Sequence, residues 1–441
     1  MRALLFSIPR SLTFAVALWI LSLCSLLLLS GPLSWVAGFV YVTYDTLLII
    51  FVASASFERK KILKQETKLE KLPTIGLMIT ARNEVRVISR CLEAIAQQTD
   101  IPEEVLWVDD GSTDGSLLRL NQWQAHTRLP LRVLAKGNSG KASAMNTAWP
   151  TLKSEVLITL DADTILESGA VKAIRKAFAL NPKLAISGGL LDVHSFERPG
   201  GIFERFQRFE YMRSFIARKA WMNTRALILV SGAFAAYRKS VLQAVGGFDP
   251  TSRVEDYELT HRIYRKAAED GEEWDVEICT EAWATTDVPG CLASLLKQRE
   301  RWFAGFIETH WQNRDLVGNP KLGNLGRWML PIKSVDMIQP LLGLTAFAGL
   351  VAFVYKFIFA GALLLIPQLV GVVLAVKILV DLFFHYYSIY AYYSWKNARV
   401  PLRTWCASTL STFLEPFSFQ LLRHTGALMG WVAVITRRRR W

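Results

Sequence analysis

Acidic side chains occur at two places where their spacing could support chemistry. Asp161 and Asp163 stand one residue apart at the end of an apolar run, and Glu255 and Asp256 are adjacent at the start of a helical pattern. Carboxylates at the end of an apolar strand are costly unless something positive holds them. A hard divalent cation takes oxygen ligands from carboxylates and a diphosphate together, so the first pair suits a metal. The second pair suits a base for an attacking hydroxyl.

A third signal supplies positive charge. Gln298, Arg301 and Trp302 lie in the segment 292–311, where apolar and charged residues alternate as in an amphipathic helix on a membrane surface. A guanidinium can bind a diphosphate through two parallel hydrogen bonds, and an indole face can stack on a sugar ring. The alternative is a surface helix with no chemical role.

In this order the signals resemble the D, DxD, ED and QxxRW pattern of membrane-embedded family 2 glycosyltransferases of the GT-A type, such as hyaluronan, chitin, cellulose and poly-N-acetylglucosamine synthases. The resemblance covers residues 73–311 with its motifs. It implies a GT-A domain, an α/β fold with a Rossmann-like mixed sheet, flanked by transmembrane α-helices. It also implies an inverting transfer of a hexose or N-acetylhexosamine from a UDP-sugar, with Mg²⁺ or Mn²⁺ as cofactor.

The same resemblance assigns roles to individual residues. Asp256, together with Glu255, would be catalytic, and Asp163 would bind the metal. The donor would be bound by polar residues near the strand ends and on the amphipathic segment: Asn83, Glu84, Asp109, Asp110, Lys141, Asp161, Gln298 and Arg301. The acceptor would contact two small residues and an indole: Ser231, Gly232 and Trp302.

Arg82 and Val254 depart from the family pattern, which usually has an aromatic or small residue at the first position and Thr at the second. The segment that ends at Lys141 superficially resembles a nucleotide-binding phosphate loop. Its spacing does not match that motif, and Ala142 stands where Ser or Thr would hold magnesium. The sequence therefore disfavours an NTPase.

Elements of an α/β domain must position these groups. Apolar runs of strand length occur at 75–81, 104–109, 131–135 and 155–160, and helical stretches follow at about 84–98, 114–127, 140–151 and 167–179. This alternation predicts a largely parallel sheet, whose ligand crevice lies beyond the carboxyl ends of the strands. A further strand is expected within 231–239, with small residues at its start.

Hydrophobic residues make up 51% of the 441 positions, and they are clustered. No charged residue occurs from Ser11 to Tyr44, and a Gly-Pro pair interrupts this run, so we expect two helices near 11–29 and 33–57. A cleavable signal peptide is the alternative, but the run continues too long after the turn. Basic residues flank both ends of the hairpin, which favours cytoplasmic ends and a cytoplasmic central domain.

A second apolar region follows the amphipathic segment, with runs at 335–355, 357–393 and 405–435. We expect four to six transmembrane helices in total, and four are preferred because the basic tail favours an even number. Ionisable residues lie within apolar surroundings at four positions: Asp45, Lys377, Asp381 and Glu415. They would line a polar path, or the lysine and the aspartate one helical turn after it would satisfy each other.

The formal net charge of +13 concentrates beside apolar segments, which indicates anionic lipid headgroups as partner and not nucleic acid. Five scattered cysteines without metal-ligand spacing indicate a reducing compartment, with neither a disulfide framework nor a zinc site.

The predicted domains are a transmembrane hairpin (1–57), a basic linker (58–72), the GT-A domain (73–284), interface helices (285–334) and a second transmembrane region with a basic tail (335–441). The expected function is extension of a polysaccharide at the cytoplasmic face of the cell inner membrane, coupled to export, with accessory synthase or export subunits as further partners. One alternative is a single transfer to a lipid acceptor. A non-catalytic membrane scaffold is disfavoured because the required carboxylates and the Arg-Trp pair are all present.

Overall fold

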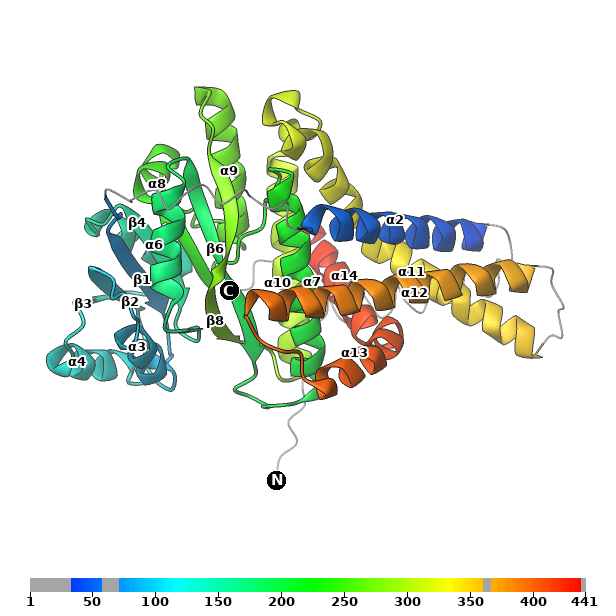
Figure 1. Ribbon diagram of the computed structural model, residues 1–441, viewed down its shortest axis with the longest axis horizontal. Coiled ribbons are helices and arrows are strands. Elements are labelled where there is room, and N and C mark those ends of the chain that lie inside the picture. Colours follow the sequence, from blue (N-terminus) through cyan, green and yellow to red (C-terminus); the bar gives the residue numbers. More distant parts are fainter. Residues whose placement is uncertain (1–32, 58–70, 360–365, 438–441) are drawn as a thin grey trace.

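The computed structural model describes residues 33–57, 71–359 and 366–437, which form an α/β domain and a group of long helices beside it (Figure 1). The helix expected at 11–29 and most of the basic linker lie outside these residues.

One mixed sheet of eight strands forms the centre of the α/β domain, in the order β3-β2-β1-β4-β7-β6-β8-β5. Its strands are β1 (Ile75–Ala81), β2 (Glu104–Asp110), β3 (Leu131–Lys136), β4 (Val156–Asp161), β5 (Ile165–Leu166), β6 (Leu184–His194), β7 (Phe234–Arg238) and β8 (Asp275–Asp287). The first four are parallel, whereas β7 is antiparallel to both β4 and β6. The four predicted strands are confirmed to within one residue at each end.

The register of the parallel strands brings acidic residues to one edge of the sheet. Asp109 of β2 pairs with Ala81 at the end of β1, and Asp161 of β4 pairs with Thr80 on the other side of β1. The strands themselves are buried because helices cover both faces, as expected for continuous apolar runs. The carboxylates therefore stand at the ends of buried strands, and those of Asp109 and Asp110 are themselves buried.

The helices of this part are α3 (Ile88–Ala96), α4 (Ser116–His126), α5 (Lys141–Ala148), α6 (Ala170–Leu180), α7 (Ile202–Asn223), α8 (Lys239–Val245), α9 (Glu255–Asp270) and α10 (Leu292–Gln312). The first predicted helix begins at residue 88, and not near 84. Asn83 adopts a φ of 60°, and its Oδ1 accepts a hydrogen bond from Thr113 N at 2.8 Å. This contact with the loop after β2 takes the place of a first helical turn.

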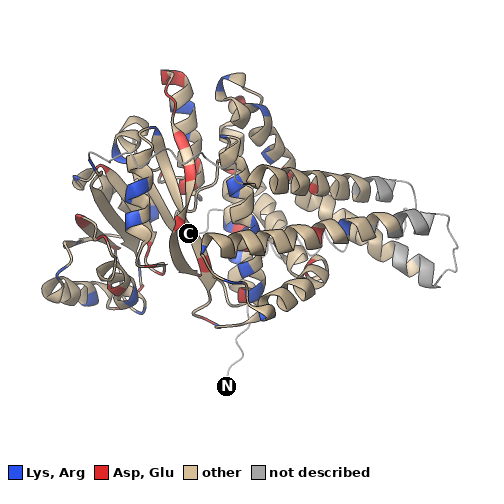
Figure 2. Cartoon of the chain, viewed as in Figure 1, with Lys and Arg blue, Asp and Glu red and all other residues tan. Residues whose placement is uncertain are grey.

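The helical part contains α2 (Leu33–Ser56), α11 (Leu330–Phe359), α12 (Ile366–Trp395), α13 (Leu402–Leu414) and α14 (Phe419–Ile435). Two segments, Gly38–Ser56 and Leu325–Ala352, have the length and composition of a membrane span. Charged side chains are sparse along α2, α11 and α12, which extend away from the sheet (Figure 2). The apolar run 405–435 is broken at Pro416 into α13 and α14, each shorter than the roughly 20 residues that a span needs.

Two helices connect the sheet to this helical part. α7 packs against α2 and α12, and α10 packs against α14. Added Cβ atoms on Gly426 and Gly430 of α14 would lie 2.5 Å from Arg299 Cβ and 2.9 Å from Ala304 N of α10. α10, the amphipathic segment of the sequence, is thus enclosed between two parts of the chain, and even its Glu300 is buried. The amphipathic segment is therefore a helix packed within the protein and not only a helix on a surface.

Candidate active site

A cavity of about 1040 Å³ lies where the carboxyl ends of the strands meet α7, α10 and the long helices. Most of the predicted site residues line it: Lys141, Asp161, Asp163, Ser231, Gly232, Glu255, Asp256, Gln298, Arg301 and Trp302. The remaining four predicted residues lie outside its lining: Asn83, Glu84, Asp109 and Asp110. The fold therefore brings together motifs that are up to 161 residues apart, from Lys141 to Trp302.

Lys141, the first residue of α5, joins two of these motifs. Its Nζ lies 2.5 Å from Asp161 Oδ1 and 3.2 Å from Glu255 Oε1. Burial alone would lower the pKa of Lys141, but the two carboxylates raise it above its usual value, so the side chain stays charged. Burial likewise opposes ionisation of Glu255, but Lys141 holds the pKa of that carboxyl below its usual value. Lys141, which is expected to contact the donor, therefore forms ion pairs with two carboxylates of the protein.

Asp256 is fixed in orientation by two backbone N–H groups. Its Oδ2 accepts a hydrogen bond from Gly232 N at 2.7 Å, and its Oδ1 accepts one from Tyr257 N at 2.8 Å. A side chain at position 232 would meet the carboxylate, because an added Cβ lies 3.1 Å from Asp256 Oδ2. Burial, followed by the negative charge of Glu255, raises the pKa of Asp256. A held carboxylate with a raised pKa suits a general base.

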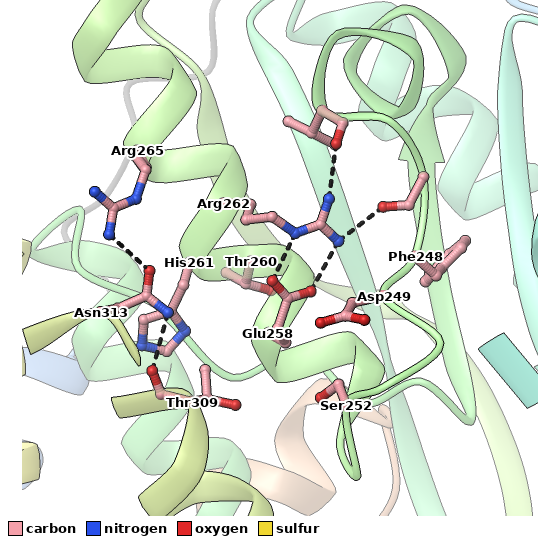
Figure 3. A network of polar contacts seen from close by, with 12 residues as sticks. Phe248, Asp249, Ser252, Glu258, Thr260, His261, Arg262, Arg265, Thr309 and Asn313 are labelled. Atoms are coloured by element: carbon pink, nitrogen blue, oxygen red, sulfur yellow. Dashed lines mark hydrogen bonds and ion pairs between the residues drawn. The ribbon is translucent and has the colours of Figure 1, made fainter. Parts of the chain in front are cut away.

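Interactions farther along α9 fix its position against α10 (Figure 3). Arg262 donates two hydrogen bonds to Glu258 at 2.6 and 2.8 Å and two more to backbone carbonyls that precede α9. Arg265 Nη2 donates to Asn313 Oδ1 at 3.0 Å, just after α10 ends. The acidic start of α9 is therefore held at a defined place relative to the helix that carries Arg301.

Asp163 lines the cavity close to other carboxylates. Burial, followed by the charges of Asp161, Glu84 and Asp287, raises its pKa to about 7. Within the part of the chain that the structure describes, no three His, Cys, Asp or Glu side chains are arranged to hold a metal ion by themselves. Mg²⁺ is commonly bound by one or two carboxylates together with substrate phosphates. Asp163 fits a cation of that kind.

Arg301 and Trp302 line the cavity from α10. Arg301 Nη1 donates to the carbonyl of Arg253 at 3.0 Å, and its guanidinium forms no ion pair with the described residues, although its charge helps to lower the pKa of Glu255. The guanidinium of Arg299 lies 4.7 Å from the centre of the Trp302 ring, and its Nη2 donates to Glu210 Oε2 at 2.6 Å. Arg299 thus packs on the Trp302 indole and is itself held by α7.

The remaining predicted donor residues mainly connect loops at the sheet edge. Asp110 accepts hydrogen bonds from Gly140 N at 2.8 Å and Lys136 Nζ at 3.2 Å, so its carboxylate is occupied. Asp109 Oδ2 accepts one from Ser112 N, whereas its buried Oδ1 has no partner among the described residues. Their contact with a donor stays a prediction.

Sequence analysis missed α7, although it forms one side of the cavity and supplies Glu210. A signal for it was present. Apolar residues recur at helical spacing and are buried in the structure: Phe206, Phe209, Met212 and Ile216.

A family model described as "Glycosyltransferase like family 2" matches residues 73–305, more than half of the chain. A poly-beta-1,6-N-acetyl-D-glucosamine synthase of Staphylococcus epidermidis is 25% identical over 308 residues, which are 69% of this chain and 69% of that protein. The corresponding synthase of Staphylococcus aureus strain COL is 24% identical over 273 residues, 62% and 61% of the two chains. The structure of a mannosyltransferase from Pyrobaculum calidifontis, in complex with GDP-Man and Mn²⁺, aligns with a TM-score of 0.52 and 18% identity. The alignment covers 89% of this chain and 99% of that one, and it shows a shared GT-A fold.

The contacts of Lys141 lead to a stability prediction. Lys141→Met should lower the free energy of unfolding by about 1–3 kcal/mol, because Asp161 and Glu255 lose their shared cation in a partly exposed site. Lys183→Met is the matched control, since it removes a fully exposed partner of Glu273 and should leave the free energy of unfolding unchanged. Thermal unfolding of the purified variants checks both values, and equal effects would contradict a special role for the bridge.

Proposed function

The chain belongs to the family described as glycosyltransferase like family 2 and is a glycosyltransferase, and we propose that it extends a polysaccharide from a UDP-sugar donor. The growing chain would accept each sugar at the cytoplasmic face of a membrane and would pass outward between α2, α11 and α12. Relatives named as poly-beta-1,6-N-acetyl-D-glucosamine synthases support a polymeric product.

The proposed reaction is a single displacement. The acceptor hydroxyl attacks C1 of the donor sugar from the face opposite the diphosphate, and its proton passes to Asp256 as the new C–O bond forms. The bond between C1 and the diphosphate breaks, UDP leaves, and the configuration at C1 is inverted. The backbone N–H groups of Gly232 and Tyr257 hold the carboxylate of Asp256 in the orientation in which it would accept the proton.

Charge on the departing diphosphate needs compensation, and two sides of the cavity offer it. A divalent cation held by Asp163, with Asp161 beside it, would neutralise diphosphate oxygens. Arg301, whose guanidinium forms no ion pair in the described chain, would bind the same diphosphate from α10. Lys141 keeps Asp161 and Glu255 from repelling each other across the site.

One observation carries the proposal of chain extension. The cavity that contains Asp163 and Asp256 continues without interruption to Lys377 and Glu415, which lie among the long apolar helices. Polar residues along such a path suit a hydrated saccharide. A product formed next to Asp256 would therefore lie in the same cavity that extends between the long apolar helices.

A second candidate function has support from the same cavity. Apolar side chains of two long helices also line it, and they would suit an acyl or prenyl chain: Ile49, Val52, Phe347 and Leu350. In that case the enzyme would transfer one sugar to a lipid. Product size separates this candidate from chain extension.

We expect the purified enzyme, given a panel of UDP-sugars with Mg²⁺ or Mn²⁺, to release UDP and form products of many sugar units with one of them. Diluting labelled donor with excess unlabelled donor during the reaction should then lengthen chains that are already labelled. Gel analysis of the products checks this expectation. A single sugar on an extractable lipid, with no longer species at any donor concentration, would support the lipid acceptor instead.

Metal dependence follows from the position of Asp163. Asp163→Asn should abolish turnover, and EDTA should abolish turnover of the parent enzyme until Mg²⁺ or Mn²⁺ is restored. Rates of UDP release measure both effects. Full activity in EDTA would rule out the metal assignment.

Asp256→Asn should still bind UDP but lose transfer by a factor of about 10²–10⁴, since that is the usual contribution of a general base. Asp256 can act as a base only when it is ionised. Because its pKa is raised, the activity of the parent enzyme should be lost on acidification at a pH above the ordinary pKa range of an aspartate. The pH dependence of the transfer rate constant measures this limb. Lost UDP affinity with unchanged turnover at saturation would indicate a donor-binding role.

A further inference from the structure

One face of α7 presents three hydrogen-bonding side chains to the cavity. Tyr211, Ser214 and Arg218 follow one another at helical spacing, three and then four residues apart, and all three line the cavity together with Asp256. None of them belongs to the acidic pairs or to the Gln-Arg-Trp signal. We call these three residues the α7 face.

The α7 face has unused hydrogen-bonding capacity. No described residue forms a hydrogen bond or ion pair with any of its three side chains, and Arg218 Nε is buried without a partner. The guanidinium of Arg218 lies over the Phe215 ring, 4.7 Å from its centre. This contact positions the guanidinium but does not neutralise its charge. A buried polar atom such as Arg218 Nε is costly unless a ligand completes its hydrogen bonding.

Arg218 differs from most other cations on the cavity wall, which have carboxylate partners. Arg213, also on α7, donates to Glu415 Oε2 at 2.7 Å. The other paired cations are Lys141, Arg299, Lys333, Lys377 and Arg423. Within the described residues, Arg218 and Arg301 alone line the cavity without such a partner, and Arg301 is already proposed to bind the diphosphate. Arg218 is therefore available for another ligand.

The chemistry of the α7 face suits a sugar ring. Two hydroxyl groups can both donate and accept hydrogen bonds, and a guanidinium donates several in one plane, which matches the hydroxyl groups around a ring. An anionic group here would add negative charge next to Asp256 and would disfavour the ionised form in which Asp256 acts as the base. α7 also carries Glu210, whose carboxylate accepts a hydrogen bond from Arg299 where Arg299 packs on the Trp302 indole, so the helix that bears this face also contacts the residues around Trp302.

We propose that Tyr211, Ser214 and Arg218 bind the second sugar unit of the acceptor, the one that precedes the unit stacked on Trp302. This inference rests on the proposed saccharide acceptor and adds a subsite to it. The enzyme would then hold two consecutive units of the chain, one against an indole and one against the α7 face.

The test uses the purified full-length protein without donor, titrated calorimetrically with N-acetylglucosamine and with a β-1,6-linked N-acetylglucosamine pentasaccharide. Arg218→Met should weaken pentasaccharide binding by roughly tenfold to a hundredfold, the usual effect of losing hydrogen bonds to a charged group. Tyr211→Phe and Ser214→Ala should each weaken it less. Binding of the monosaccharide and of UDP should stay within about twofold of the parent, because neither reaches the α7 face.

Arg213→Met is the matched control on the same helix. It leaves Glu415 without its close bidentate partner and should lower the midpoint of thermal unfolding, whereas Arg218→Met removes an unpaired charge and should leave that midpoint unchanged or higher. Equal loss of stability in both variants, with equal loss of monosaccharide and pentasaccharide binding, would mean that Arg218 is structural and would overturn the proposal.

Two further outcomes would also overturn it. One is that the parent protein binds no pentasaccharide. The other is that Arg218→Met weakens binding of a polyprenyl phosphate in vesicles and leaves pentasaccharide binding intact. Failure of the proposed function is seen separately, as absence of polymer in the donor assay. The binding titrations need no donor, so they decide the subsite in either case.

Discussion

One ammonium group on the first turn of α5 connects the two acidic motifs of this enzyme. Asp161 ends a strand of the sheet and Glu255 begins a helix almost a hundred residues later, and each would repel the other without Lys141 between them. The arrangement leaves Asp163 and Asp256 as the carboxylates without a lysine of their own. Lys141 therefore pairs with two of the four carboxylates, and the two that form no ion pair with it are the ones proposed to bind the metal and to act as the base.

The cavity wall formed by α10 shares side chains with the helical part. Arg299 packs on Trp302 and donates to Glu210, whose other oxygen lies 3.2 Å from Arg423 Nε of α14. Arg423 is also close to Glu415, the partner of Arg213. The indole proposed to hold the acceptor is thus linked by contacting charges to α7, to α14 and to the turn that precedes α14.

Sequence patterns predicted the sheet better than the loops and the helical part. The strands were found because buried parallel strands are continuous apolar runs, and the acidic motifs were found because charges follow them directly. The start of α3 was misplaced because Asn83 is held by Thr113, about thirty residues away. Arg299 and Glu210 were missed for the same reason, since only the fold brings α7 beside α10. The bridging position of Lys141 was equally hidden, although its motif was recognised.

The contact between α14 and α10 sets an order for assembly of the enzyme. α10 carries Gln298, Arg301 and Trp302, and it is covered by Gly426 and Gly430 near the end of the chain. During synthesis the ribosome releases α10 before α14 exists, so this side of the cavity stays uncovered until α14 is made and docked. A nascent chain therefore completes the packing of α10 only after α11, α12 and α13 have been made.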